Sequence, residues 1–399
     1  VHIKRRRHHV TIPNLITSPR STLHISSSQS QLIPPSLNPK SNPSSLRIKQ
    51  PPNFHSTMAA PTTPTMRAWQ YSTSNGPLPQ TIHLNPSTPY PPFSPTQPQM
   101  LVAVTSMSLN PADYKIAEMS PLINNLMVSK PATPGMDFSG RVVKLGSSTD
   151  VFKVGDRVFG RLEPGQFGSL GEFVVAAYDA CAVLPDGLDE DLAAGVGTAG
   201  LTAYQTIVPN VKEGDRVFIN GGSGSVGTFG IQIAKAVGCH ISVSCSTGKI
   251  EACKQSGADE VIDYTKEDVT QRLVDVGLVY SLVVDNVGTS PSDLYTRADK
   301  FLLPEGKFVQ VGGSASLGTA RIYASRLFLP RILGGGSRKF EAFFTKNSRG
   351  DLEQIARWIA EGKVKVPVEQ TFEYADVPKA IESLKSGGGK GKIIVHVGK

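Results

Sequence analysis

Cysteine is scarce in this chain of 399 residues. The four cysteines, Cys181, Cys239, Cys245 and Cys253, form no C-x-x-C pair. Their spacing excludes a disulfide framework and a zinc knuckle, and it predicts ordinary buried thiols in a reducing compartment. Long apolar runs are lacking too. Because no stretch comes near the roughly 18 apolar residues that a transmembrane helix needs, we expect no membrane partner.

Acidic residues are missing from residues 1–57, which contain eight Lys or Arg and no Asp or Glu. Subtracting these eight from the total of 41 leaves 33 basic residues, which equals the 33 acidic residues of the whole chain. From Met58 onward the chain is therefore neutral. This balance gives no electrostatic argument for nucleic-acid binding by the folded part, so we expect no nucleic-acid partner.

Residues 1–65 also lack a periodic apolar pattern, and we expect a disordered, basic, Ser/Pro-rich extension. Three origins stay open for it. It resembles a mitochondrial transit peptide, its residues 4–9 (KRRRHH) could form a nucleic-acid arm, or translation starts later, at Met58 or Met66. A genuine targeting segment would place the protein in the mitochondrion, and otherwise we expect the cytoplasm.

A glycine-rich turn follows the apolar strand at residues 216–220 (RVFIN) and precedes a helical pattern over 226–237. Gly222, Gly224 and Gly227 match the G-x-G-x-x-G spacing: the first allows a tight turn, the second a close approach to a pyrophosphate, and the third close helix–strand packing. Ser225 and Val226 lie at the helix start, where free amides and the helix dipole attract phosphate. The pattern predicts dinucleotide binding.

A carboxylate is missing where an NAD-preferring site needs one, about 20 residues beyond the glycines. Residues 244–249 (SCSTGK) supply hydroxyls and an ammonium instead. Ser246 and Thr247 could bond to a 2′-phosphate and Lys249 could neutralise it, which predicts NADPH. The alternative is an ordinary polar loop with a surface lysine.

Two kinds of periodicity divide the remaining chain. Residues 66–194 read as short strands with Gly/Pro turns, which predicts a mostly antiparallel unit in which residues 77–98 form a surface loop. Residues 195–318 alternate strands with helices over 226–237, 249–256, 266–276 and 291–302, which predicts an α/β fold with a doubly wound parallel sheet. We expect residues 319–399 to complete the first unit.

The motifs LNPADYK (109–115), TPGMDFSG (133–140), AGLTAY (199–204), GSGSVG (222–227) and GKIIV (391–395) occur in the order of a known superfamily. Over residues 66–399 the chain resembles the medium-chain dehydrogenases/reductases, and within them the zinc-free quinone oxidoreductase and alkenal/enone reductase branch. The resemblance implies a GroES-like catalytic domain (66–194, completed by 319–399), a Rossmann domain (195–318) that binds NADPH, and a cleft between them. It also allows a homodimer.

Zinc-dependent members of that superfamily carry zinc ligands at the positions of Asn110, Met136 and Thr198. Zinc prefers Cys, His or carboxylate ligands, so these three residues predict that no metal is bound. The structural zinc lobe is also missing, because residues 160–180 contain no cysteine.

The resemblance implies hydride transfer from NADPH to a quinone or an α,β-unsaturated carbonyl compound. The developing oxyanion needs hydrogen-bond donors and a proton source, for which Asn110, Tyr114 and Lys115 are the candidates. For Lys115 the alternative is a solvated helix start. By position, further cofactor contacts are implied for Thr202, Tyr264, Asn286, Gly312, Phe343 and Lys390.

Two other functions stay open. The chain could be a trans-acting enoyl reductase of secondary metabolism, which resembles the same branch. It could instead be a nucleotide-binding sensor or scaffold with little turnover. The sequence does not identify the substrate.

Overall fold

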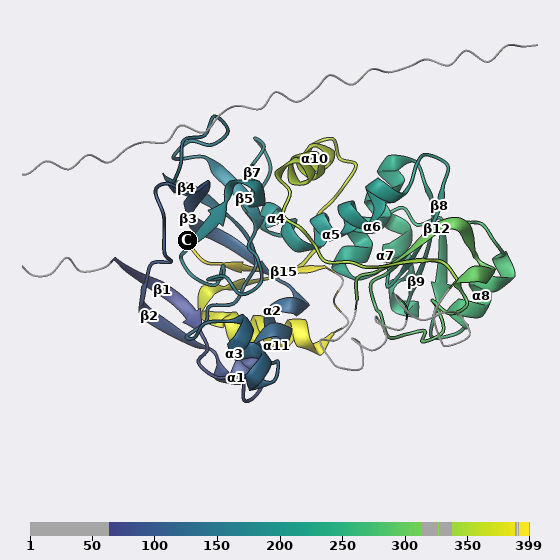
Figure 1. Ribbon diagram of the computed structural model, residues 1–399, viewed down its shortest axis with the longest axis horizontal. Helices are drawn as coiled ribbons and strands as arrows, with labels where there is room; N and C mark the ends of the chain where they lie inside the picture. The colour runs from purple at the N-terminus through teal and green to yellow at the C-terminus, as the bar shows by residue number, and fades with distance from the viewer. Residues whose placement is uncertain (1–63, 313–325, 327–336, 388, 390, 399) are drawn as a thin grey trace, which may run out of the picture. The chain divides into compact units, whose positions relative to one another are not determined.

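Two large β-sheets carry the fold of the described residues, one parallel and one mostly antiparallel (Figure 1). The computed structural model describes residues 64–312, 326, 337–387, 389 and 391–398. These belong to one compact unit that spans residues 61–399.

The six-stranded sheet is parallel throughout, with the order β10-β9-β8-β11-β12-β13. Helices α6 (Ser225–Val237), α7 (Ile250–Gln255) and α8 (Val269–Val276) connect its strands. The prediction of a doubly wound α/β sheet is confirmed. Its strands are β8 (Arg216–Asn220), β9 (His240–Cys245), β10 (Glu260–Asp263), β11 (Tyr280–Asp285), β12 (Leu302–Gln310) and β13 (Lys339–Ala342).

Apolar residues on both faces bury this sheet, as the strand alternation requires. On β8, Val217 and Ile219 join the core formed with α5 (Gly197–Ile207), α6 and α10 (Arg349–Ala360). Phe218 between them joins the core on the other face, which includes Leu273 of α8. The carboxyl ends of the strands stay free for polar loops.

The other sheet has seven strands, with the order β14-β15-β3-β4-β5-β7 and β6 paired to β3. Its pairs are antiparallel except β14–β15. The C-terminal strands thus join strands from the first half of the chain. The strands are β3 (Gln99–Leu109), β4 (Asp137–Leu145), β5 (Arg157–Arg161), β6 (Phe173–Ala177), β7 (Cys181–Val183), β14 (Val368–Glu373) and β15 (Lys392–His396).

Among the described residues, further helices accompany this sheet, including α2 (Pro111–Ala117), α3 (Pro121–Met127), α4 (Glu190–Ala194) and α11 (Val377–Ser386). A core of buried apolar side chains from β3, β4, β15 and α11 fills its interior. No helix of the described residues is long and apolar enough to cross a membrane.

The helix predicted over residues 291–302 is wrong. The segment consists of turns and one 3₁₀ turn, Ala298–Lys300. Leu294, Tyr295, Ala298 and Phe301 are all buried, so their spacing imitates a helix. Packing of these side chains under the sheet, rather than a helical backbone, explains the pattern.

The surface loop predicted over residues 77–98 is correct only for residues 90–98, and the part before them is wrong. It contains α1 (Leu78–Thr81) and β2 (His83–Pro89), which pairs with β1 (Thr65–Gln70). This two-stranded sheet has only edge strands, which tolerate residues such as Pro86 and Pro89 because a missing N–H can face away from the partner.

Candidate functional site

The site begins at the point where the parallel sheet reverses its strand order. Strands β8 and β11 are neighbours, and the chain winds outward from them in opposite directions. The loops that follow them, residues 221–224 and 286–288, therefore meet at the carboxyl edge. Ligands of doubly wound sheets bind at this edge.

Each glycine of the turn has a distinct steric role. Gly221 has a φ of +77°, so the tight turn belongs to Gly221 and not to Gly222 as predicted. A Cβ on Gly222 would lie 2.7 Å from the Val243 Cβ, and one on Gly227 would lie 2.3 Å from the Gly221 carbonyl oxygen. A Cβ on Gly224 would meet nothing closer than 3.8 Å. The backbone at Gly224 is thus open to a ligand.

A groove of about 430 Å³ lies beside this turn, and we call it the glycine groove. Gly224, Ser225, Val226 and Gly227 line it, and α6 begins at Ser225, so the first helical amides face it. Leu109 and Ile393 of the antiparallel sheet also line it, as does Asn110, which directly follows β3. The groove is therefore formed by both sheets.

A second cleft of about 690 Å³ shares Asn110, Val226 and Asn286 with the glycine groove. We call it the threonine cleft, because Thr198, Thr202, Thr289 and Thr345 line it. The shared residues place the two spaces next to each other.

Asn286 stands at this junction with an unsatisfied amide. Neither its Nδ2 nor its Oδ1 has a hydrogen-bond partner within the described residues, although both atoms are buried. The Asp285 carboxylate fixes the turn by accepting the N–H groups of Val287 (3.1 Å) and Gly288 (2.9 Å). Because buried polar groups are normally bonded, this amide fits a site for a ligand with polar groups.

Three further residues that were predicted to contact the cofactor line the threonine cleft: Thr202, Gly312 and Phe343. The Thr202 hydroxyl donates to the Thr198 carbonyl oxygen (2.6 Å) and lies 2.5 Å from the Thr345 hydroxyl. Gly312 approaches the Asn286 backbone so closely that a Cβ would lie 2.2 Å from its carbonyl oxygen. Phe343 also lines this cleft.

The residues predicted to bind a 2′-phosphate are only partly brought together. Lys249 and Tyr264 line the glycine groove, and Lys249 Nζ donates to the Gly389 carbonyl oxygen (2.5 Å). Ser246 does not line it. The Thr247 hydroxyl donates to Asp263 (2.5 Å), which lowers the pKa of that carboxyl and leaves the hydroxyl occupied. Lys390 lies outside the described residues.

Helix α2 places two of the three predicted catalytic residues at the clefts. Asn110 precedes the helix, and its backbone N–H donates to the Asp113 carboxylate (2.7 Å). Asn110 lines both clefts, and Lys115 lines the threonine cleft. Tyr114 lines neither. It packs against the core of the antiparallel sheet, with Lys385 Nζ 5.2 Å from its ring centroid.

Sequence reasoning missed a buried charge pair behind Asn110. The ends of β15, β3 and β4 lie side by side, with Ile393 opposite Leu109 and Ser108 opposite Asp137. This register brings Lys392 Nζ to 3.1 Å from Asp137 Oδ2. The signal was present in the GKIIV and TPGMDFSG motifs, but no local pattern reveals that they are neighbours.

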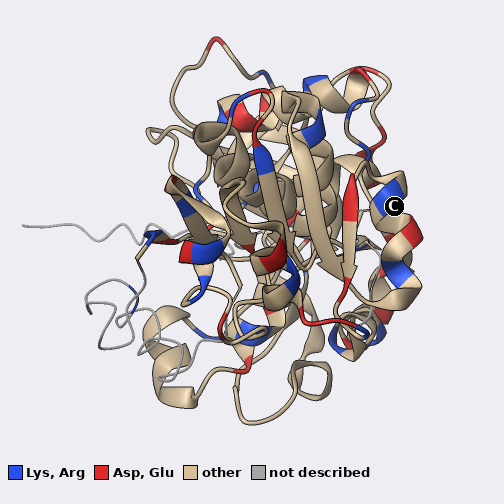
Figure 2. Ribbon diagram, turned by 90° about the vertical axis from the view of Figure 1, so that its right-hand side faces the viewer, with Lys and Arg blue, Asp and Glu red and all other residues tan. Residues whose placement is uncertain are grey.

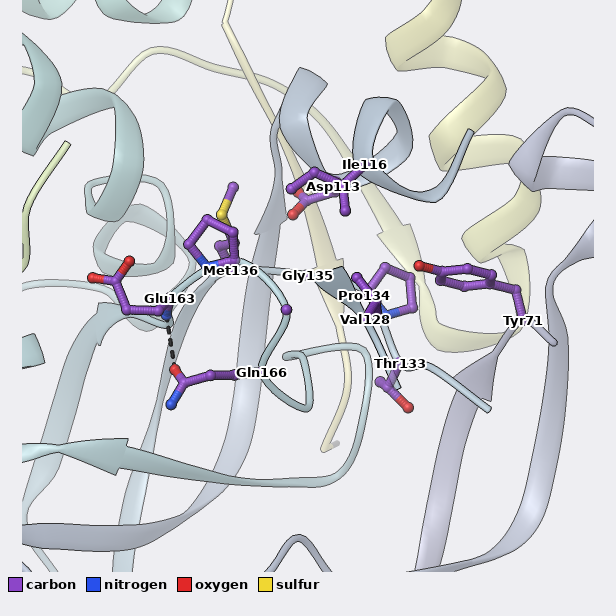
Figure 3. A pocket seen from close by; sticks show the side chains of 12 residues that line it. Tyr71, Asp113, Ile116, Val128, Thr133, Pro134, Gly135, Met136, Glu163 and Gln166 are labelled. Atoms are coloured by element: carbon purple, nitrogen blue, oxygen red, sulfur yellow. Dashed lines mark hydrogen bonds between the residues drawn. The ribbon is translucent and has the colours of Figure 1, made fainter. Parts of the chain in front are cut away.

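Asp113 lines a cavity of about 30 Å³ together with Ile116, Pro134 and Met136 (Figure 3). Burial raises the pKa of Asp113 to about 7. The Asn110 N–H and the cations Lys392 and Arg161 oppose that rise, whereas the nearby Asp137 adds to it. The carboxyl therefore titrates near neutral pH.

Comparison with known proteins defines the class. Residues 96–186 match the family model of the alcohol dehydrogenase GroES-like domain, and residues 256–395 match that of the zinc-binding dehydrogenases. The chain belongs to the medium-chain dehydrogenase/reductase superfamily and is a nicotinamide-dependent oxidoreductase. The resemblance seen in the sequence is confirmed.

Individual relatives span most of the chain. It is 42% identical to the trans-enoyl reductase pgmF of Aspergillus terreus, over 85% of this chain and 98% of the relative. It is 30% identical to the mitochondrial NAD(P)H oxidoreductase RTN4IP1 of Homo sapiens, over 75% and 82%. The solved quinone oxidoreductase of Coxiella burnetii superposes with a TM-score of 0.72 at 29% identity, over 84% of this chain and 100% of that one.

A nicotinamide dinucleotide fits the residues present. The unsatisfied amide of Asn286, the open backbone at Gly224 and the start of α6 all face the shared clefts. Zinc does not fit them. The three ligand positions hold Asn110, Met136 and Thr198, and the described residues contain no group of three or more His, Cys, Asp or Glu that could hold a metal.

Proposed function

We propose that the protein transfers a hydride from NADPH to a quinone or an α,β-unsaturated carbonyl compound, without zinc. The observation that carries the proposal is the junction at Asn110 and Asn286, which joins the glycine groove to the threonine cleft. A cofactor that extends along the groove and ends at this junction would present its reactive end to the cleft.

Each end of the cofactor has its own residues. The pyrophosphate would bind at Gly224, Ser225, Val226 and Gly227, with Lys249 and Tyr264 at the adenosine end. At the nicotinamide end, Asn286 would bond to the cofactor, and Thr202, Gly312 and Phe343 would shape the cleft. When bound, the cofactor supplies the hydride.

The chain's own residues stabilise the charge that develops on the substrate. Reduction of a conjugated carbonyl or a quinone places negative charge on an oxygen, which hydrogen-bond donors in a water-poor site stabilise. The Asn110 amide and the Lys115 ammonium are two of the donors that line the threonine cleft. Tyr114 has no place in this proposal, since it lines neither cleft.

The residues at the three zinc-ligand positions suit these substrates. Oxidation of an alcohol requires loss of the hydroxyl proton as hydride leaves, and zinc assists this step as a Lewis acid, whereas a conjugated double bond accepts hydride without such activation. Asn110, Met136 and Thr198 therefore fit reduction of an activated double bond better than oxidation of an alcohol.

A second candidate is a trans-acting enoyl reductase, and the similarity to pgmF of Aspergillus terreus favours it. This function uses the same chemistry on an enoyl thioester. An enoyl thioester carries a much larger group beyond its carbonyl than a free enone does. Faster reduction of enoyl thioesters would favour the trans-acting enoyl reductase, and faster reduction of free enones or quinones would favour the first function.

The cellular setting belongs to the same proposal. We infer a cytoplasmic enzyme, or a mitochondrial one if residues 1–57 are a targeting segment, as the relative RTN4IP1 suggests. Figure 2 shows basic and acidic residues interspersed over the ribbon, which suits small-molecule substrates better than nucleic acid. A homodimer is consistent with the proposal, and light scattering tests it.

The decisive experiment follows NADPH oxidation by the purified chain with a panel of quinones, free enones and enoyl thioesters. Turnover of one of these classes, faster with NADPH than with NADH, is the expected result. Cofactor binding without turnover on any of them would instead indicate a sensor or scaffold.

A further inference from the structure

The pair Lys392–Asp137 is nearly inaccessible to solvent. The exposed fractions of the two side chains are 1% and 0%, and Nζ lies 3.1 Å from Oδ2. Removing two charges from water costs free energy that their attraction often fails to recover, so stability alone is a weak reason for a buried ion pair. The pair therefore calls for another role.

Both members of the pair bond to the Asn110 amide. Lys392 Nζ donates to Asn110 Oδ1 (2.7 Å), and Asn110 Nδ2 donates to Asp137 Oδ2 (2.9 Å). If the amide turned over by 180°, its oxygen would face the carboxylate and its NH₂ group the ammonium. That repulsion fixes one orientation. The ammonium on Oδ1 also polarises the amide and makes its N–H groups stronger donors.

Asp137 is itself held firmly in place. Its Oδ1 accepts the backbone N–H (2.7 Å) and the hydroxyl (2.6 Å) of Thr198, and its Oδ2 lies 3.3 Å from the Ser108 hydroxyl. The first helical turn of α5 thus anchors the carboxylate. This anchor in turn sets the position of the Asn110 amide at the two clefts.

We propose that Lys392 and Asp137 are positioning residues that orient and polarise the Asn110 amide for hydride transfer. One N–H of Asn110 Nδ2 is used by Asp137, and the second has no partner within the described residues. The second N–H is the donor for the substrate oxygen. Lys392 therefore supplies a fixed positive charge beside Asn110, one of the three positions that hold zinc ligands in zinc-dependent relatives. This inference rests on the proposed function.

The test exchanges the whole pair, Lys392→Met with Asp137→Asn, so that no buried charge is left unpaired. Single-turnover NADPH oxidation with an active enone or quinone is then measured in the native and the Asn110→Ala backgrounds. We expect at least a tenfold slower hydride transfer in the native background, with NADPH affinity within about twofold. In the Asn110→Ala background the exchange should change the rate by less than about twofold.

A matched control exchanges a lysine–aspartate pair away from the clefts, Lys235→Met with Asp259→Asn, whose side chains lie 2.9 Å apart. It should leave hydride transfer unchanged. If the Lys392/Asp137 exchange prevents folding, Lys392→Arg replaces it. This variant keeps the positive charge but changes the geometry of the bond to Asn110, so it should slow hydride transfer in the native background and not in the Asn110→Ala background.

The outcomes separate the two proposals. If the wild type is active but the Lys392/Asp137 exchange lowers the hydride-transfer rate by the same factor in the native and the Asn110→Ala backgrounds, only the positioning role is overturned. Such an effect does not depend on Asn110 and therefore reflects a structural defect. A wild-type protein that reduces no member of the substrate panel overturns the proposed function, and the positioning role with it.

Discussion

Asn110 is the residue at which the clefts, helix α2 and the buried charge pair meet. Asn110→Ala removes the amide donor, so we expect hydride transfer to fall at least about tenfold; lost oxyanion donors elsewhere cost about 100- to 1000-fold, and Lys115 softens the loss here. NADPH affinity should change little. Single-turnover NADPH oxidation and a binding titration measure the two effects.

A matched control for this variant is Asn85→Ala, which removes an amide from β2 that bonds to Gln70 at 3.0 Å. It should not slow hydride transfer. If Asn110→Ala abolishes cofactor binding and leaves the transfer rate of bound cofactor intact, Asn110 anchors the cofactor and has no catalytic role.

Lys249 and Asn286 line the same groove but should discriminate cofactors differently. Lys249→Ala removes a cation from the adenosine end, so we expect NADPH to bind about 10- to 100-fold more weakly and NADH almost unchanged. Asn286→Ala should weaken both cofactors alike, because its amide faces the end that they share. Titration of each variant with each cofactor makes the comparison.

Asn286→Ala carries an internal check. Its side-chain amide has no partner within the described residues, so its removal should leave the free energy of unfolding of the cofactor-free protein unchanged. Equal weakening of NADPH and NADH by Lys249→Ala would refute the assignment of Lys249 to the 2′-phosphate.

Among the elements, α2 carries a pH dependence. Burial raises the pKa of Asp113 from 3.8 to about 7, so between these values the folded protein binds more protons than the unfolded chain. The free energy of unfolding therefore falls as the pH rises through this range. Asp113→Asn removes this titration and keeps an oxygen acceptor for the Asn110 N–H.

Urea denaturation at pH 5 and pH 8 measures the effect. From pH 5 to pH 8 the wild type should lose about 1–4 kcal/mol more unfolding free energy than Asp113→Asn. An identical pH slope in the two proteins would mean that Asp113 stays ionised in the folded state.

At the scale of the whole molecule, residues 1–57 should be dispensable. The compact unit spans residues 61–399, and the first strand of the described residues begins at Thr65. A chain that starts at Met58 should therefore match the full chain in Tm within about 2 °C and in turnover. Precipitation or loss of cofactor binding by the shorter chain would show that the segment supports the fold.

The purified protein should also contain no stoichiometric zinc, and chelators should not affect its activity. The residues at the zinc-ligand positions, Asn110, Met136 and Thr198, lack the thiolate, imidazole and carboxylate groups that zinc prefers. Elemental analysis tests this directly, and about one zinc per chain would contradict it.

The sequence by itself determined the class of protein and the parts of the site that lie close together in the chain. Gly224, Ser225, Val226 and Gly227 form one strand–turn–helix unit, whose chemistry depends on local spacing alone. The spacing of strands, turns and helices along the chain likewise predicted one mostly antiparallel sheet and one parallel sheet, because such spacing is also a local property of the sequence. The domain boundaries, NADPH preference and residue roles stay predictions.

Only the tertiary structure decided how distant segments meet. Lys392 and Asn110 are 282 residues apart in the chain, yet the pairing of β15 with β3 places them within a hydrogen bond. Tyr114 and Lys115 are adjacent in sequence, but only Lys115 reaches a cleft. Strand register and side-chain packing set these relations, and both depend on contacts between segments that no local pattern encodes.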